Sequence, residues 1–388
     1  MSIRPELSLD LFTDAELRDP YPTYRAIRDL APAVWLPKHE VWAIARYQDV
    51  RTALHDDDVL VSSQGVALNA FLNGQKGTTT LMSDGEAHRK RRSVLMKPMM
   101  PGALAAVRPR IEQLADALVA DLLARDSFDG IADFSRHLPV AVVSHLVGLP
   151  EEGRESMLEW AAATFNALGP MNARTEASLP MLGSMIEYAV SVERARLDPD
   201  GWAAHVFNAV DAGSLEADAA RGLLIDYIAP SLDTTLLGIG HMLYLLGTHP
   251  EQYGQLRKNA ELVPSVVNEA LRMGSPVRAF TRVATRSTEI GDVPISEGDR
   301  VLILYGAANR DERHYAEPDR FDITRAARDH LAFGHGVHRC AGSHLAQLEM
   351  ESLLRALVAS VRRIDVGEPR VLLSNMLCGY ESFDASFQ

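Results

Sequence analysis

Apolar residues recur every three or four positions along most of this chain, a spacing typical of helices that bury one face. The pattern predicts a mainly helical protein. The predicted helices cover residues 23–30, 49–55, 85–97, 102–125, 137–147, 151–167, 175–196, 215–248, 263–273 and 342–361. Pro250 follows the longest of them, and proline ends a helix because it lacks the amide hydrogen that the next turn needs.

Two regions, at about 31–62 and 277–305, carry short β-branched runs instead. In the first region, two apolar runs flank a turn at 37–40, which predicts a pair of strands. In the second region, turns at Gly291 and Gly298 separate the runs. We therefore expect a small β-rich portion beside a helical portion that makes up the rest of the chain.

Residues 59–83 follow neither pattern. Serine, asparagine, glycine and threonine dominate this stretch, with Val66, Leu68, Phe71 and Leu72 scattered among them. A long loop without its own pattern is usually functional or disordered. The apolar residues inside it predict a lid over a substrate.

The chain has 388 residues, a length that by default suggests two domains. A hydrophobic content of 47% is ordinary for a globular protein, and no internal repeat or low-complexity segment divides the chain. The helical pattern continues without a linker. We therefore expect one large domain over residues 1–388.

A formal net charge of −13 argues against nucleic-acid binding, which needs a basic face. The two cysteines, Cys340 and Cys378, exclude a disulfide framework and indicate a reducing, cytoplasmic location. The N-terminal residues lack the apolar run of a signal peptide. The most apolar stretch, 222–247, contains Asp226 and Asp233, so no membrane span is expected.

Residues 333–342 read Phe-Gly-His-Gly-Val-His-Arg-Cys-Ala-Gly and directly precede the last predicted helix. A cysteine at a helix start lies at the positive end of the helix dipole, which favours its thiolate. The glycines allow the backbone to approach a flat group closely. Such a thiolate suits a haem iron. Cys340 could also be a small buried residue, or a zinc ligand with His335 and His338, although no second pair of ligands accompanies them.

The ten-residue stretch fits the pattern Phe-Gly-x-Gly-x-His-x-Cys-x-Gly at every fixed position, and with it the chain resembles the cytochrome P-450 family of haem-thiolate monooxygenases. The resemblance extends over nearly the whole length. It implies a single-domain fold in which a long central helix lies over haem b and the thiolate loop lies beneath. It also implies that Cys340 is the iron ligand.

Further residues match the family's motifs. The resemblance implies that four of them bind the haem propionates, which need cationic or donor partners: His88, Arg92, Arg282 and His338. Glu269 and Arg272 match a Glu-x-x-Arg motif, whose two side chains share one face of a helix and form an ion pair. The third member of that network is either Arg320 or Arg325.

Asp233 and Thr234 match the acid–alcohol pair that delivers protons to bound dioxygen in the family. Pro230 and Ser231 depart from the family's small residue and glycine. Proline lacks the amide hydrogen that would bond the carbonyl of Asp226, so the long helix should kink or bulge here. We hypothesise that the Ser231 hydroxyl joins a relay of water molecules.

Substrate contacts are inferred from position relative to these motifs, and most are apolar, which predicts a small hydrophobic substrate. The inferred contacts are Phe165, Leu168, Ala229, Val277 and Phe280. Three stretches, 62–66, 165–170 and 306–311, look like family members that oxidise para-substituted benzoates. Those members hold the substrate carboxylate with a lid arginine, and Gln64 stands in its place here. A neutral phenolic, an aromatic ether or a terpenoid fits better.

The resemblance thus implies a monooxygenase that hydroxylates or O-dealkylates a small, aromatic substrate with dioxygen and two electrons. No flavin or iron–sulfur motif occurs in the sequence, so we expect a ferredoxin and its NAD(P)H-dependent reductase to supply the electrons. The alternatives are a terpenoid hydroxylase of the same family and a non-catalytic haem-thiolate protein that binds a ligand. The Asp233–Thr234 pair favours a monooxygenase, because a ligand sensor needs no proton relay.

Overall fold

The fold is taken from a computed structural model that describes residues 4–75 and 77–388. Outside the described residues lie residues 1–3, which belong to the N-terminal stretch expected to lack a signal peptide, and Lys76, which belongs to the expected lid. Among the described residues, no helix combines the length and the apolar character needed to cross a bilayer.

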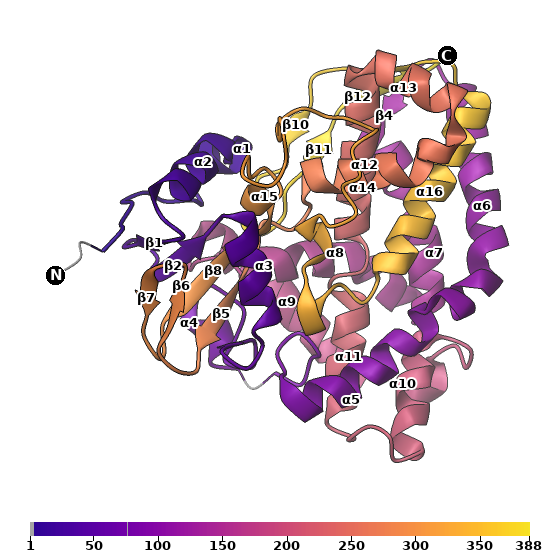
Figure 1. The fold of residues 1–388 in the computed structure, drawn as a ribbon. Coiled ribbons are helices and arrows are strands. Elements are labelled where there is room, and N and C mark those ends of the chain that lie inside the picture. Colours follow the sequence, from indigo (N-terminus) through magenta and orange to yellow (C-terminus); the bar gives the residue numbers. More distant parts are fainter. Residues whose placement is uncertain (1–3, 76) are drawn as a thin grey trace.

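Helices form the greater part of the molecule (Figure 1). They are α1 (Asp14–Arg18), α2 (Tyr21–Leu30), α3 (Tyr47–His55), α4 (Ala70–Asn73), α5 (Gly85–Met96), α6 (Pro101–Leu123), α7 (His137–Val147), α8 (Glu151–Ala167), α9 (Ala173–Ser191), α10 (Trp202–Asp211), α11 (Ala219–Ile228), α12 (Asp233–Thr248), α13 (Pro250–Lys258), α14 (Val263–Gly274), α15 (Tyr305–Ala308) and α16 (Ser343–Ser360).

The strands are short. They are β1 (Ala33–Leu36), β2 (Val41–Ile44), β3 (Leu60–Val61), β4 (Phe128–Asp129), β5 (Ala279–Ala284), β6 (Thr288–Ile290), β7 (Val293–Ile295), β8 (Arg300–Leu304), β9 (Ile364–Val366), β10 (Arg370–Val371), β11 (Tyr380–Ser382) and β12 (Asp384–Phe387). Five of them form one sheet in the order β1-β2-β8-β5-β3, in which only β2 and β8 run parallel. In Figure 1 this sheet lies to one side of the helical body.

The helical body encloses α12, which has buried residues on every side. α12 packs against α14, and α16 packs along both α14 and α6. Two glycines of α12 allow close approach: a Cβ at Gly240 would lie 2.6 Å from the Ile131 side chain, and one at Gly247 would lie 2.6 Å from Val366. The mainly helical fold with a small β part is therefore confirmed.

The structure corrects three of the sequence predictions. The helix predicted over 215–248 is two helices, α11 and α12, because Pro230 interrupts it. Helices α10 and α13 were not predicted. The C-terminal strands β9 to β12 lie outside the two β-rich regions that the sequence indicated, since each has only two to four residues and takes its partners from distant segments.

The lid predicted over 59–83 is mostly irregular but contains β3 and α4. Helix α4 begins where Asn69 accepts a hydrogen bond from the backbone amide of Leu72 at 2.9 Å, an ordinary N-cap. Arg300 donates to the carbonyl oxygens of Gln64 and Gly65, at 3.0 and 2.7 Å. The lid is therefore attached to β8, the central strand of the five-stranded sheet.

Candidate active site around Cys340

The loop before α16 has a shape that only its glycines permit. The amide of Cys340 donates to the carbonyl oxygen of Phe333 at 2.8 Å, which closes the loop. Gly334 and Gly336 have φ angles of +68° and +69°, in the left-handed region. A Cβ at Gly336 would lie 2.2 Å from the carbonyl oxygen of Leu54, so no larger residue fits there.

The Cys340 thiol lies at the N-terminus of α16. Burial raises its pKa, and the amides of Gly342 and Ser343, with the charges of Arg92 and Arg339, oppose that rise. Protein atoms surround the cysteine closely enough to raise its pKa, although the surface of its side chain remains exposed. A Cβ added at Gly342 would meet no atom within 4 Å. Together these observations place open space directly beside the thiol.

Two histidines lie together near this loop. The rings of His88, on α5, and His338 are 4.2 Å apart between centroids. His338 Nε2 is 3.4 Å from Asp84 Oδ1. His88 is buried, and its Nε2 has no hydrogen-bond partner among the described residues. Burial lowers the pKa of His88 to about 4, and the charges of His338 and Arg92 act in the same direction.

Two arginines extend this cluster. Arg92 donates to the carbonyl oxygen of Arg339 in the loop. Arg282, on β5, is buried; burial lowers the pKa of His338, and the charge of Arg282 acts in the same direction. Burial would raise the pKa of Asp84, but hydrogen bonds from His338 and from Ser63 and Ser62 outweigh it and hold that pKa well below its usual value. The cluster is therefore rich in donors and has Asp84 as its acid.

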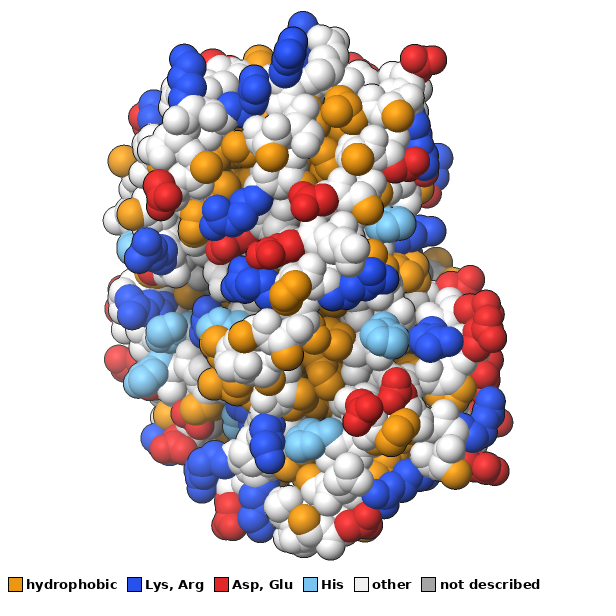
Figure 2. Space-filling model, turned by 90° about the vertical axis from the view of Figure 1, so that its right-hand side faces the viewer, with side chains coloured by type: hydrophobic (Ala, Val, Ile, Leu, Met, Phe, Trp, Pro, Cys, Tyr) orange, Lys and Arg blue, Asp and Glu red, His pale blue; other side chains and the backbone are white. Residues whose placement is uncertain are grey.

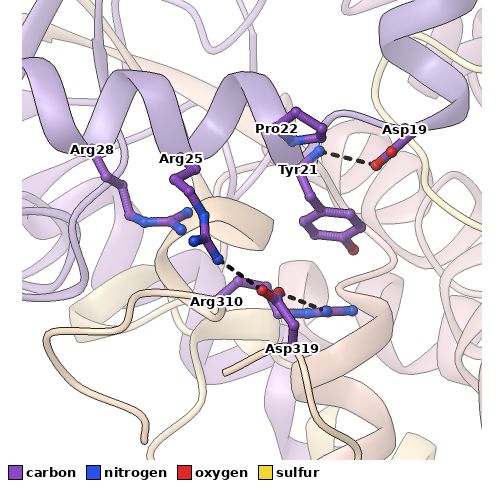
Figure 3. A pocket seen from close by; sticks show the side chains of 7 residues that line it. All are labelled: Asp19, Tyr21, Pro22, Arg25, Arg28, Arg310 and Asp319. Carbon is purple, nitrogen blue, oxygen red and sulfur yellow. Dashed lines mark hydrogen bonds and ion pairs between the residues drawn. The ribbon is translucent and has the colours of Figure 1, made fainter. Parts of the chain in front are cut away.

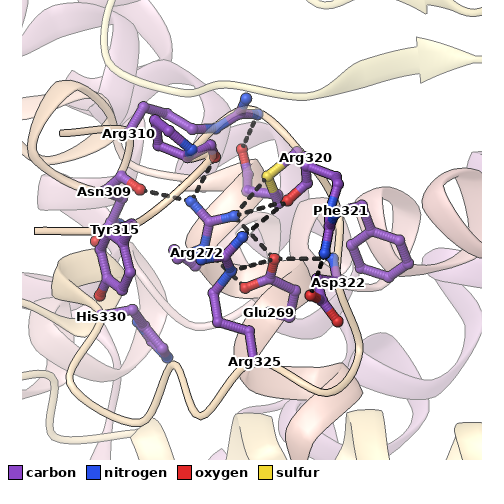
Figure 4. Close-up of polar contacts among 12 residues, drawn as sticks. Glu269, Arg272, Asn309, Arg310, Tyr315, Arg320, Phe321, Asp322, Arg325 and His330 are labelled. Atoms are coloured by element: carbon purple, nitrogen blue, oxygen red, sulfur yellow. Dashed lines mark hydrogen bonds and ion pairs between the residues drawn. The ribbon is translucent and has the colours of Figure 1, made fainter. Parts of the chain in front are cut away.

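A buried ion pair supports the loop from α14 (Figure 4). Arg272 binds Glu269 through two parallel contacts of 2.7 and 2.8 Å, and neither side chain is exposed. Arg272 Nη1 also donates to the carbonyl oxygen of Asn309 at 2.8 Å. The Asn309 side chain accepts from the amide of Leu331 at 2.7 Å, immediately before the Cys340 loop.

The structure decides which arginine completes this network. Arg325 Nε donates to Glu269 Oε1 at 3.2 Å, and the amide of Asp322 donates to the same oxygen at 3.1 Å. Arg320 instead pairs at the surface with Glu317 and Asp322. Arg325 is therefore the third member.

The break between α11 and α12 lies at residues 229–232. Asp233 begins α12, and burial raises its pKa to about 7. The hydroxyl of Thr234 donates to the carbonyl oxygen of Pro230 at 2.9 Å, and that of Ser231 donates to the carbonyl oxygen of Tyr227. Asp233 and Thr234 thus lie directly after the break between α11 and α12, where the sequence predicted a kink within one long helix.

No group of three histidine, cysteine or acidic residues arranged for a metal ion occurs in the part of the chain that the structure describes. The chain matches the family model described as Cytochrome P450 over residues 30–147 and 200–362. The chain belongs to the cytochrome P450 family. Members are monooxygenases that bind haem b, so this P450 is an oxidoreductase that uses haem and dioxygen, receives electrons from a redox partner and acts on a small substrate.

Two relatives extend the comparison. The P450 is 36% identical over 384 residues to cytochrome P450 CYP199A2 of Rhodopseudomonas palustris, an alignment that covers 97% of this chain and 93% of the relative. It is 31% identical over 387 residues to a beta-dihydromenaquinone-9 omega-hydroxylase of Mycobacterium bovis, with 94% of this chain and 75% of the relative covered.

Solved structures show the same fold. P450BioI in complex with an acyl carrier protein that carries hexadec-9Z-enoic acid matches with a TM-score of 0.86 and 27% identity, covering 96% of this chain and 98% of that one. CYP108D1 from Novosphingobium aromaticivorans matches with a TM-score of 0.84 and 27% identity, covering 96% and 95%. The single-domain P450 fold expected from the sequence is therefore confirmed.

The residues present in this P450 fit haem b. The open space beside Cys340 leaves room for a flat group, as the Gly342 position shows. The unpartnered Nε2 of His88, beside His338, Arg92 and Arg282, suits the negative charge of two propionates. These observations are independent of the family match and agree with it.

The residues inferred to contact substrate come from separate elements of this P450. Phe165 and Leu168 are buried at the end of α8, and Ala229 is buried in the break after α11. Val277 and Phe280 are partly buried and pack against the core. Val277 forms a bridge with Leu377, and the amide of Leu68 in the lid donates to the carbonyl oxygen of Leu168 at 2.9 Å.

Asp226, near the C-terminal end of α11, binds the lid. Its Oδ2 accepts from the amide of Thr80 at 2.6 Å, and burial raises its pKa to about 6. Sequence reasoning also missed Arg300, which holds the lid backbone at Gln64. No motif marks either contact, because both join side chains to the backbone of a distant loop.

A charged pocket beside α2 is separate from these residues (Figure 3). It is lined by Asp19, Tyr21, Pro22, Arg25, Arg28, Arg310 and Asp319. Arg25 and Arg310 both pair with Asp319, at 3.0 and 3.1 Å. Its lining is charged, whereas the inferred substrate contacts are apolar, so we do not assign the substrate to it.

Proposed function

We propose that this P450 hydroxylates or O-dealkylates a small, neutral, aromatic substrate, with Cys340 as the ligand of the haem iron. The observation that carries the assignment of Cys340 is its exposed thiol beside open space, at the N-terminus of α16 and near a cluster of histidine and arginine side chains. Haem supplies an iron that binds and activates dioxygen.

The chain's own residues perform the remaining tasks. His88, Arg92, Arg282 and His338 orient the haem through its propionates. The Glu269–Arg272 pair keeps the Cys340 loop in place through Asn309.

Asp233, whose pKa of about 7 lies near physiological pH, holds a proton for the oxygen chemistry, and Thr234 lies next to it. The Thr234 hydroxyl donates to the Pro230 carbonyl here, so it must turn away from that carbonyl to donate a hydrogen bond to a ligand.

The neutral substrate follows from the charges near the inferred contacts. Phe165, Leu168, Ala229, Val277 and Phe280 offer no cation, and Gln64 stands where a benzoate-oxidising member carries an arginine. Arg300 is already bonded to the lid backbone and to Thr281. A substrate carboxylate would therefore be desolvated without a partner.

We further propose a ferredoxin with an NAD(P)H-dependent reductase as the electron donor. Arg339 is exposed in the Cys340 loop and can contact an acidic partner. Figure 2 shows lysine, arginine and histidine side chains around deeper hydrophobic side chains in the middle of one face, with acidic side chains interspersed among them. An acidic protein could dock on such a face despite the net charge of −13.

Two measurements test these assignments. The reduced protein with carbon monoxide should show the difference band of a thiolate-bound haem, and Cys340→Ala should lose that band while Cys378→Ala keeps it. A Soret titration should then give a high-spin shift with 4-methoxytoluene and none with 4-methoxybenzoate, which differ mainly in the carboxylate. A tight shift with 4-methoxybenzoate would overturn the neutral-substrate proposal, and a shift only with a monocyclic terpene would favour the terpenoid hydroxylase.

The electron donor needs a separate test. Product should form with NADH, a ferredoxin and its reductase, and not with hydrogen peroxide alone. Binding without any product would instead indicate a ligand-binding protein.

A further inference from the structure

Two buried asparagine side chains connect three segments that are far apart in the sequence. Asn69, in the lid, is only 5% exposed, and its Nδ2 donates to the carbonyl oxygens of Ala167 and Gly169 at 2.8 and 2.7 Å. Its Oδ1 caps α4 through the amide of Leu72. One side chain therefore holds the lid to the corner between α8 and α9.

Asn375 holds the same corner from the C-terminal turn, and it is fully buried. Its Nδ2 donates to the carbonyl oxygen of Asn166 at 2.9 Å, and its Oδ1 accepts from Asn172 Nδ2 at 3.0 Å. Its own amide donates to Asn166 Oδ1 at 3.0 Å. A Cβ at Gly169 would lie 2.5 Å from the Asn375 side chain, so the corner packs directly on it.

Two residues inferred to contact substrate, Leu168 and Val277, lie close to these asparagines. Leu68 precedes Asn69, and Leu168 lies between the two carbonyls that Asn69 binds. Leu377 follows Asn375 by two residues and bridges Val277. The asparagines thus position apolar side chains from the lid, the corner and the C-terminal turn.

We propose that Asn69 and Asn375 form a clasp that keeps these three segments closed over the substrate and sets the rate at which ligands enter and leave. Both are positioning residues, because neither is among the inferred substrate contacts. Opening requires the buried hydrogen bonds of the two asparagine side chains to break together, since these bonds join both side chains to the same corner. The inference rests on the proposed haem and substrate positions.

The chain supplies a matched control. Asn73 also lies in the lid and also makes two bonds to backbone, but both join it to Ala67 within the lid, at 3.0 and 2.9 Å. Asn73→Ala therefore removes an asparagine of the same loop without separating the lid from the corner.

Asn69→Asp provides a second discrimination. The aspartate keeps an oxygen that can cap α4 at Leu72 but loses both donations to the corner. A residue needed only to cap α4 would tolerate this change.

The probe is 4-phenylimidazole, an aromatic ligand of haem iron whose binding shifts the Soret band. In stopped-flow measurements on the holoenzyme, Asn69→Ala, Asn69→Asp and Asn375→Ala should each raise its association and dissociation rates about tenfold. Asn73→Ala should leave both rates unchanged, and carbon monoxide, which is small, should bind all variants at the wild-type rate.

Hydrogen exchange provides a readout that does not depend on haem. The amide of Leu68, which donates to Leu168, should exchange faster in the three clasp variants than in Asn73→Ala. Unchanged probe rates in Asn69→Asp, or equal rates in all four variants, would overturn the clasp. A wild-type protein without the carbon monoxide band would instead contradict the haem proposal.

If Asn375→Ala fails to fold, Asn69→Asp and the exchange measurement still decide the matter.

Discussion

The hydroxyl of Thr234 donates a hydrogen bond to the carbonyl oxygen of Pro230 at 2.9 Å, across the interruption between α11 and α12. Pro230 has no amide hydrogen for the carbonyl of Asp226, so the backbone leaves the helix there. The Pro230 carbonyl is satisfied instead by the side chain of Thr234. Asp233 and Thr234, the proposed proton-relay residues, therefore lie at the start of α12, and α12 starts there because Pro230 interrupts the helix.

Asp233 should control the pH dependence of turnover. Burial raises its pKa to about 7, and a donor delivers a proton only while it is protonated, so turnover should fall as pH rises through about 7. Asp233→Asn should be slower by roughly 100-fold and should lose this inflection. The measurement is NADH consumption with ferredoxin, reductase and 4-methoxytoluene between pH 5.5 and 9. An inflection that survives in the asparagine variant would exclude Asp233 as its source.

Ser231 should affect how efficiently reducing equivalents reach product. Its hydroxyl donates to the carbonyl oxygen of Tyr227, and a hydroxyl with one donated proton can still accept from water. We expect Ser231→Gly to release more hydrogen peroxide per NADH consumed. Peroxide is measured by a coupled peroxidase assay, with Ser178→Gly on α9 as a control for a serine that bonds the carbonyl one turn earlier. Unchanged peroxide release in Ser231→Gly would remove this residue from the relay.

The buried Glu269–Arg272 pair should stabilise the fold strongly. Glu269→Gln leaves the Arg272 guanidinium buried beside a neutral amide, which should lower the free energy of unfolding by about 3 kcal/mol and weaken the thiolate band. Glu317→Gln breaks an exposed pair with Arg320 and should cost less than about 1 kcal/mol. Urea unfolding compares the two. Equal losses would mean that the network does not support the Cys340 loop.

Glu349 should make stability depend on pH. It is fully buried on α16, both carboxyl oxygens lack partners among the described residues, and burial raises its pKa to about 8 from 4.5. Between those values the folded state keeps a proton that the unfolded state has lost, so stability falls as pH rises from about 4.5 to 8.

Glu349→Gln cannot ionise, so it should match the wild type near pH 5 and exceed it by a few kcal/mol at pH 8.5. Urea unfolding at both pH values measures this difference. Glu351→Gln, two residues further along α16, removes a carboxylate paired with Arg355 and is the control. If Glu349→Gln and the wild type lost stability equally on raising the pH, another group would be responsible.

Local patterns predicted much of the helical framework. The bounds of α7 and α8 agree with the prediction, because the apolar spacing of each is local, and Gly148 and Pro150 separate the two helices. The prediction of one helix over 215–248 was wrong because apolar residues continue on both sides of Pro230. The spacing of apolar residues does not show that Pro230 lacks an amide hydrogen. Strands β9 to β12 were missed because such short pieces have no pattern of their own.

The sequence by itself determined the Cys340 loop. Its closing bond joins Cys340 to Phe333, seven positions away, and its shape needs only glycines that the sequence displays. The tertiary structure alone decided that Arg325 and not Arg320 reaches Glu269, and that Asn69 holds Gly169 across 100 residues. The physical reason is that such contacts depend on where folded segments meet. The sequence does not show whether the side chain of an asparagine or arginine hydrogen-bonds to water or to a buried group of the protein.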